Sequence, residues 1–304
     1  MSALINTIHV LPWNEKKVFL TLNMAAKSAP FDSKNNSQSE VDGWFILSEL
    51  GGDTLRVGYM AVADPASKIS LYSSRKSLLK FKNRSKTKGY AKGFTLASVS
   101  DTESETASTI ESLGWRSTSL FGAPAIEFAI TTKGAWTSLS AYRAILRIDN
   151  DSDGSFDHTL YLHDYGNLGQ KTGTVTSQKQ PSSTPNGIWT LADADYDYND
   201  RSASGVWIRD VNAFGPGYPN IGFLAPGDND FDYQLTMVNL STGEADTISG
   251  TIDLTQEITV DVPNFVLDSR EKVRINITSD VEGRMLWTFQ SNQTERQTTI
   301  VDID

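Results

Sequence analysis

The chain has 304 residues, with 27 basic and 37 acidic side chains and no cysteine. Disulfides, thiol nucleophiles and cysteine zinc sites are therefore excluded, and three histidines leave little scope for histidine catalysis. No apolar run approaches the roughly 18 residues that a membrane-spanning helix needs. The first twenty residues lack a basic start and are interrupted by Asn6 and His9, so we expect neither a signal peptide nor a membrane span.

The first part of the chain contains short apolar runs rich in β-branched and aromatic residues, at 18–22, 43–47 and 54–62. Such runs predict strands. We expect this module to end at residue 63, with a short tie at 64–67. A sandwich of sixty-odd residues buries little and leaves strand edges open, so residues 1–63 are expected to be incomplete without packing or a strand from elsewhere.

The longer second module, 68–304, continues in the same way. Its predicted strands lie at 126–131, 142–148, 159–163, 205–211, 231–239, 273–277 and 285–289. One stretch, 102–112, predicts a short helix because Thr102 and Glu105 fit a capping box. Many short strands separated by Gly-, Pro- and Asp-rich turns predict an all-β chain of tandem antiparallel β-sandwiches.

Charge is unevenly distributed along the sequence. Residues 65–100 hold no acidic residue, and their basic residues are Lys68, Arg75, Lys76, Lys80, Lys82, Arg84, Lys86, Lys88 and Lys92. The remainder is strongly acidic, which disfavours nucleic acid as a general partner. The favoured interpretation of the basic stretch is a solvated strand whose lysines protect a sheet edge. An anionic surface polymer, or an acidic face of another copy, remains an alternative partner.

The most specific local pattern is the segment 149–157, between the predicted strands 143–148 and 159–163. Carboxylates recur at alternate positions, and Gly154 permits a sharp turn. Calcium prefers six to eight oxygen ligands, which such a wrapped loop supplies. We expect Ca²⁺ to be bound by Asp149, Asp151, Asp153, Asp157 and the carbonyl of Ser155. Position twelve is Leu160 and no helices flank the loop, so the fit to an EF-hand is partial, and an acidic turn without an ion is the alternative.

Other candidate sites are less specific. Two further acidic clusters, at 193–200 and 228–232, are interpreted as solvated loops, with cation binding left open. Nothing in their spacing selects a carboxylate pair for glycoside hydrolysis. G-x-S-x-G, P-loop, G-x-G-x-x-G and H-E-x-x-H motifs do not occur, and His158 and His163 are expected on opposite faces of a strand. The chain is therefore expected not to be an enzyme.

Seven tryptophans raise the possibility of sugar stacking. Four of them lie in or beside apolar runs and are expected in the core: Trp44, Trp136, Trp207 and Trp287. Three lie nearer turns and are the better candidates for exposure: Trp13, Trp115 and Trp189.

Several segments together resemble the non-catalytic C-terminal region of large secreted subtilisin-like serine proteases. Residues 43–47 and 55–59 are similar to the fibronectin-III-like pattern G-(aromatic)-(apolar)-L … L-R-V-P-Y, with Gly58 in place of the proline. The most specific match covers 127–136 and 148–157, which resemble F-x-I-x-T-x-G-x-W-S … I-D-T-D-x-D-G-x-x-D. Residues 81–96 and 285–287 are similar to flanking strands of that region.

The resemblance implies a calcium-stabilised extracellular or cell-surface accessory module. Residues 1–63 would then be part of a fibronectin-III-like sandwich, and the partner would be a protease domain or further copies of the chain. The serine, histidine and aspartate motifs of the protease are missing, so no catalytic residue is carried over. Two alternatives stay open: a self-assembling filament or layer subunit that uses strand complementation, and a glycosidase.

Overall fold

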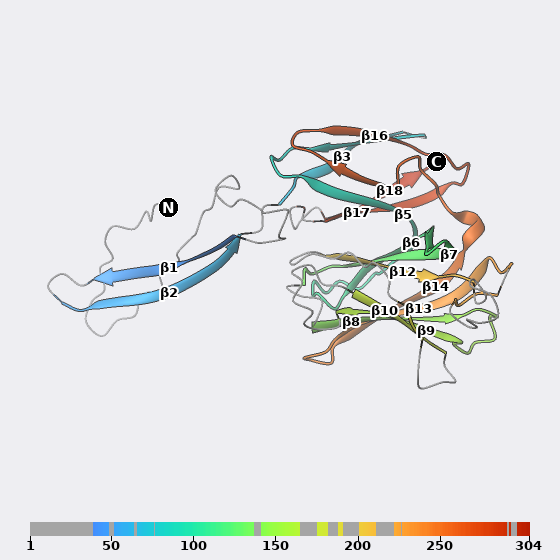
Figure 1. Ribbon diagram of the computed structural model, residues 1–304, viewed down its shortest axis with the longest axis horizontal. Coiled ribbons are helices and arrows are strands. Elements are labelled where there is room, and N and C mark those ends of the chain that lie inside the picture. The colour runs from blue at the N-terminus through green and yellow to red at the C-terminus, as the bar shows by residue number, and fades with distance from the viewer. Residues whose placement is uncertain are drawn as a thin grey trace. The chain divides into compact units, whose positions relative to one another are not determined.

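The computed structural model describes residues 39–48, 52–63, 66–75, 77–136, 141–164, 175–181, 188–190, 201–210, 222–225, 227–290, 292 and 297–304. The chain divides into two compact units, Met1–Pro65 and Ala66–Asp304. All pairings between named strands of the described residues are antiparallel, which confirms the predicted all-β sandwich class (Figure 1). Among these residues, no helix is long and apolar enough to cross a bilayer.

In the first unit, the described residues form a two-stranded ribbon of β1 (Ser39–Ser48) and β2 (Thr54–Ala63). The predicted strands 43–47 and 54–62 lie within it, and the one at 18–22 lies outside the described residues. The rings of Phe45 and Tyr59 pack with centroids 4.7 Å apart. Trp44 is 65% exposed, so its expected place in the core is wrong. Among the described residues of this unit, the two strands have no second layer to cover their faces.

The second unit is built on three sheets. A seven-stranded sheet contains β5 (Gly89–Val99), β6 (Ile110–Leu120), β7 (Ala123–Thr132), β12 (Ser202–Ile208), β15 (Asn264–Leu267), β17 (Gly283–Gln290) and β18 (Thr298–Ile303). A six-stranded sheet contains β8 (Tyr142–Asp149), β9 (His158–Asp164), β10 (Val175–Pro181), β11 (Ile188–Thr190), β13 (Asp230–Asn239) and β14 (Ala245–Asp253). A three-stranded sheet contains β3 (Ile69–Arg75), β4 (Leu78–Asn83) and β16 (Lys272–Asn276).

The seven-stranded sheet packs on both of the others, through two separate apolar cores. One core joins β6, β7 and β12 to the six-stranded sheet through residues such as Phe128, Trp207 and Tyr233. The second joins β5, β17 and β18 to the three-stranded sheet through residues such as Phe81 and Trp287. The two lobes are visible in Figure 1, with β5 and β17 in the upper one and β13 and β14 in the lower one.

A buried ion network crosses the seven-stranded sheet. Glu127 on β7 is 3% exposed and accepts a hydrogen bond from Lys92 Nζ at 2.9 Å. It also pairs with Arg116, which stands directly opposite on β6. Ser204 and Asn264 accept hydrogen bonds from Lys92 and Arg116, respectively. Lys92 therefore belongs to the interior and not to a solvated basic strand.

The expected helix at 102–112 is wrong. Residues 101–105 have no regular structure, a turn follows at 106–109, and strand β6 begins at Ile110. The Ile110 amide donates to Asp246 on β14 (2.9 Å) and the Lys133 amide donates to the Thr109 carbonyl (2.9 Å). The capping-box pattern was local, and these tertiary partners override it.

Three tryptophans occupy the core as expected, since Trp136, Trp207 and Trp287 are at most 2% exposed. Trp115, which was one of the better candidates for exposure, is equally buried. It lies on β6, the strand whose first residues fell within the predicted helix. Trp13 and the side chain of Trp189 lie outside the described residues.

Candidate metal site

The acidic loop, residues 149–157, connects β8 to β9 in the six-stranded sheet. These two strands pair directly, with Ile148 opposite His158. Ile148 is fully buried in the first core, and its carbonyl accepts a hydrogen bond from the Asp157 amide at 2.8 Å. The Asn150 side chain donates to the Phe223 carbonyl (3.2 Å). The loop is thereby attached at both ends to buried structure.

Within the loop, carboxylates bind backbone amides and fold the chain back on itself. Gly154 N donates to Asp149 Oδ2 (2.8 Å) and Asp153 N donates to Asp151 Oδ1 (3.2 Å). Ser155 N donates to Asp153 Oδ1 (2.7 Å). Ser152 and Gly154 have φ values of 56° and 87°, in the left-handed region that tight turns use. This folding brings side chains from alternate positions together.

Three of the expected ligands converge. One oxygen each from Asp149, Asp151 and Asp153 lies within 4.8 Å of the other two. Asp149 is only 3% exposed, and its Oδ1 is buried without a hydrogen-bond partner. A buried carboxylate oxygen with no partner is energetically costly. A hard divalent cation bound among the three oxygens would remove that penalty.

The other two expected ligands are placed differently. Asp157 Oδ2 accepts a hydrogen bond from the Asn150 amide (3.0 Å), and its carboxylate is not one of the three that converge. Ser155 is bound into the turn through its amide, next to the Asp153 carboxylate. The Asp157 carboxylate and the Ser155 amide therefore take part in the hydrogen bonds that fold the loop.

The charges of the loop act on one another. The hydrogen bond from the Asp153 amide lowers the pKa of Asp151, while desolvation and the charges of Asp153, Asp157 and Asp149 raise it. The raising effects win, so the pKa of Asp151 lies above its ordinary value. The loop is thus a site of mutual repulsion between carboxylates, which a cation would relieve.

Asp232 is a neighbour of this site that sequence reasoning missed. It lies on β13 directly opposite Asp149, so the two side chains share one face of the sheet. Thr251 Oγ1 donates a hydrogen bond to the Asp232 carboxylate. In the sequence, Asp232 was grouped with Asp228 and Asp230 as a separate cluster. Only the strand register, which local pattern does not reveal, places it beside the loop.

The remaining candidate groups contribute no second described site. Asp228 and Asp230 are exposed, and Asp230 faces Asp253 across β13 and β14. The cluster at 193–200 and the side chain of His163 lie outside the described residues. The only group of metal-binding side chains among the described residues is therefore that of the acidic loop.

Comparisons with known proteins do not place the chain in a family. No family model, no curated protein and no solved structure matches it.

Proposed function

We propose that this chain is a non-catalytic, calcium-stabilised β-sandwich module that serves as an extracellular accessory region. The observation that carries the proposal is the buried, unpartnered Oδ1 of Asp149 beside the carboxylates of Asp151 and Asp153. Calcium accepts irregular shells of oxygen ligands, whereas Mg²⁺ demands near-octahedral geometry and retains its waters. The accessory role rests on the resemblance of 127–136 and 148–157 to the C-terminal region of subtilisin-like exoproteins.

The role of the cation in this proposal is to close the β8–β9 hairpin. Asp149 ends β8, and Ile148 and Leu146 of the same strand are buried in the first core. A cation held by Asp149, Asp151 and Asp153 would fix the turn against that strand. The carboxylate of Asp232, which stands opposite Asp149 on β13, would add negative charge next to the bound cation. Bound calcium would therefore stabilise the whole sandwich and not only its loop.

Thermal unfolding with and without Ca²⁺ tests this. If Ca²⁺ at a hundred times its Kd binds only the native state, it adds about 2.7 kcal/mol. For a domain of this size we expect Tm to rise by about 5–10 °C. Mg²⁺ at the same concentration should raise Tm much less. Superimposable curves in Ca²⁺ and in chelator would reject the site.

The variant Asp151→Asn sharpens the test, because its amide oxygen retains the hydrogen bond from the Asp153 amide while the charge is lost. In chelator we expect its Tm to equal or exceed that of the parent, since repulsion is relieved. In Ca²⁺ we expect a lower Tm than the parent. The same change at the exposed Asp101, outside the loop, should have no calcium-dependent effect. A loss at Asp151 that is equal in both conditions would contradict a role in binding.

A second candidate function is self-assembly through the first unit. The described ribbon exposes large apolar side chains, with Trp44 at 65%, Ile46 at 60% and Leu55 at 60%. Exposed apolar groups on a sheet favour association with another chain. Light scattering after size-exclusion chromatography should then show oligomers. The double variant Trp44→Ser with Ile46→Ser should be monomeric, whereas Phe121→Ser, at an exposed apolar site of the second unit, should not change the size. A monomeric parent would exclude this candidate.

A further inference from the structure

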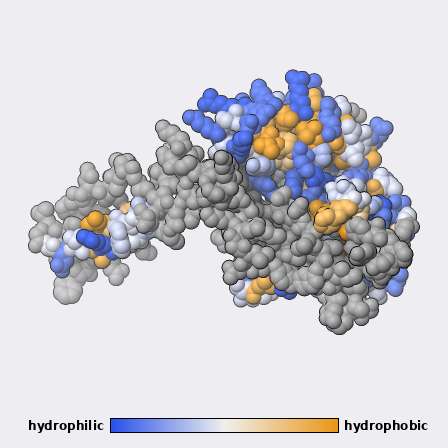
Figure 2. All heavy atoms as spheres, viewed as in Figure 1, coloured by the Kyte–Doolittle hydropathy of each residue, from blue (hydrophilic) through white to orange (hydrophobic). Residues whose placement is uncertain are grey.

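The outer face of the three-stranded sheet carries a compact group of cations. Lys80 and Lys82 lie on β4, and Lys272 and Arg274 lie on β16. The register pairs Lys82 with Lys272 and Lys80 with Arg274. We call these four residues the basic face. Figure 2 shows long hydrophilic side chains projecting from the lobe that contains β3 and β16.

The direction of the basic face is fixed by the core beneath it. Leu79 and Phe81 alternate with the two lysines on β4, and both are fully buried. On β16, Ile275 is fully buried beside Arg274. Because successive side chains of a strand point to opposite faces, the four cations must point away from the core.

This arrangement is electrostatically unfavourable in the free protein. Like charges directly opposite each other on neighbouring strands destabilise a sheet. Among the residues that the structure describes, none of the four forms an ion pair or a side-chain hydrogen bond. The edge-protection interpretation does not apply to Lys80 and Lys82, because β4 is the central strand of its sheet. The four cations are therefore unneutralised among the described residues, and protection of an edge does not explain the two on the central strand β4.

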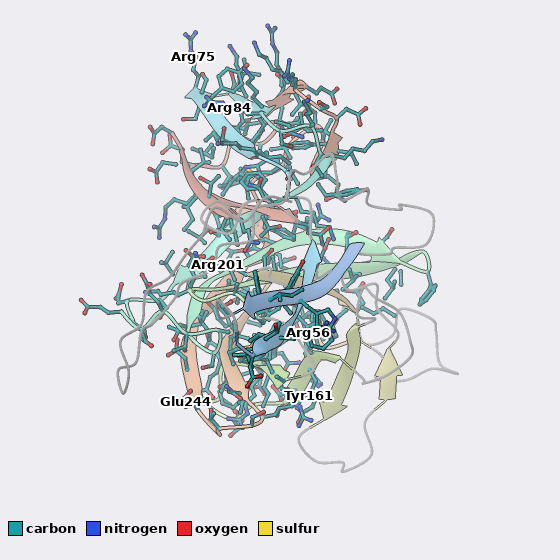
Figure 3. The ribbon with its side chains drawn as sticks, turned by 90° about the vertical axis from the view of Figure 1, so that its left-hand side faces the viewer. Arg56, Arg75, Arg84, Tyr161, Arg201 and Glu244 are labelled. Atoms are coloured by element: carbon teal, nitrogen blue, oxygen red, sulfur yellow. The ribbon has the colours of Figure 1, made fainter. Side chains whose placement is uncertain are left out.

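Arg84 adds a further cation at one end of the basic face, and the acidic residue Asp268 lies nearby, paired with Lys88. Arg84 continues the alternation of β4, and its amide donates to the Lys68 carbonyl (2.9 Å). Figure 3 shows Arg75 and Arg84 at one end of the second unit and Glu244 at the other. Lys88 is paired with Asp268 at 3.1 Å. The free cations thus form a narrow area on one end of an otherwise acidic unit.

We propose that the basic face binds a linear polymer of phosphate groups. Lysine binds phosphate oxyanions as a compact point charge, the arginine fork also matches phosphate, and the basic face consists of three lysines and one arginine. Side chains two apart on one strand stand about 7 Å apart, and neighbouring strands about 5 Å. The basic face therefore offers two parallel rows of charge that a single extended polyanion can follow.

Two other kinds of partner fit less well. Protein interfaces are depleted in lysine and depend on aromatic and apolar anchors, whereas the centre of the basic face consists of cations. A nucleic-acid duplex is much wider than the two rows. It would bring phosphates towards exposed Asp268 at one end of β16 and exposed Asp261, which binds Asn276, at the other. A thin polymer avoids both acids.

The test measures binding of fluorescent long-chain inorganic polyphosphate to the full chain in chelator, which removes any contribution of the calcium loop. With four contacts, log K should fall with log salt concentration with a slope of about 3, at roughly 0.7 per contact. The variant Lys82→Gln with Lys272→Gln should lower the slope to about half that value. The matched control, Arg56→Gln with Arg284→Gln, makes the same charge change outside the basic face and should bind like the parent.

Other results overturn the proposal. If the control variant, Arg56→Gln with Arg284→Gln, lost as much polyphosphate affinity as the variant in the basic face, the binding would reflect net charge alone. If single phosphate ions bound with the affinity of the polymer, the basic face would not be a row of sites. Tighter binding of single-stranded DNA or polyglutamate at equal charge would point to a different partner. Because the variant removes opposed like charges, its Tm should equal or exceed the parent's, which separates lost binding from unfolding. A lower Tm would contradict the repulsion on which the proposal rests.

Discussion

The variant Glu127→Gln should lower the free energy of unfolding by about 3–5 kcal/mol, because it leaves two buried cations without their counter-charge. Lys92 and Arg116 are 18% and 10% exposed in their side chains and both pair with Glu127. Urea unfolding at neutral pH measures the loss. Glu103→Gln, at an exposed site, is the control and should change stability by at most about 0.5 kcal/mol.

A third variant separates charge from packing. Replacing Glu127, Lys92 and Arg116 together with apolar residues of similar volume should restore most of the stability, since no unpaired charge then remains. If the triple variant is less stable than Glu127→Gln, the network is held by its hydrogen bonds to Ser204 and Asn264 more than by charge.

The same residue predicts a pH dependence. Burial raises the pKa of Glu127, but the charges of Lys92 and Arg116 together lower it by more than burial raises it. The pKa of Glu127 therefore lies below its ordinary value of 4.5. A carboxyl group with a lowered folded-state pKa stabilises the fold above its unfolded pKa. That stability is lost as pH falls through the folded value. The difference between the parent and Glu127→Gln should therefore be constant above pH 4.5 and shrink below it.

Trp287→Ala should also lower the free energy of unfolding by about 3–5 kcal/mol, through the cavity it leaves in the second core. Trp287 is fully buried, with ring centroids 4.7 Å from Phe81 and 5.6 Å from Phe265. It lies over Gly93, where an added Cβ would come within 2.7 Å of the indole. The close fit leaves the site little freedom to collapse.

Two controls define this result. Tyr90→Ala removes an aromatic ring that is 48% exposed on β5 and should have a much smaller effect. Trp287→Phe should be less damaging than Trp287→Ala, because it leaves a smaller cavity and loses no hydrogen bond, since the indole N–H has no partner. An effect at Tyr90 as large as that at Trp287 would mean that the second core does not depend on the indole.

Local pattern was sufficient for the turn of the acidic loop and for half of the named strands, namely β1, β2, β7, β8, β9, β12, β13, β16 and β17. Alternation on β4 and β16, and the alternate aspartates after β8, are encoded within a few residues. The wrong predictions for 102–112 and for Trp115 involve contacts between distant segments. Thr102 and Glu105 look like a helix start until Asp246 on β14 binds the amide of Ile110. The local sequence placed Trp115 near a turn, and its burial follows from the place of β6 against the first core.

The candidate site shows the same division. The spacing of Asp149, Asp151 and Asp153 predicted their convergence, because a turn glycine and alternate positions determine it locally. The orientation of Asp157 towards the Asn150 amide and the place of Asp232 across the sheet were not predictable in this way. They depend on how the loop closes and on which strand pairs with β8.

The hydrogen bonds of Asn292 have a consequence for how the protein is made. Asn292 Oδ1 accepts from the Ile69 amide at 2.8 Å, across 223 residues of sequence, and Asn292 Nδ2 donates to the Ile69 carbonyl. In the same way, residues 90–95 of β5 pair with residues 285–290 of β17, which come much later in the sequence. During translation, β3 and β5 therefore leave the ribosome long before Asn292 and β17, which pair with them. Nascent chains must hold these strand edges unpaired, and a ribosome that stalls before β17 would release a product with an open sheet.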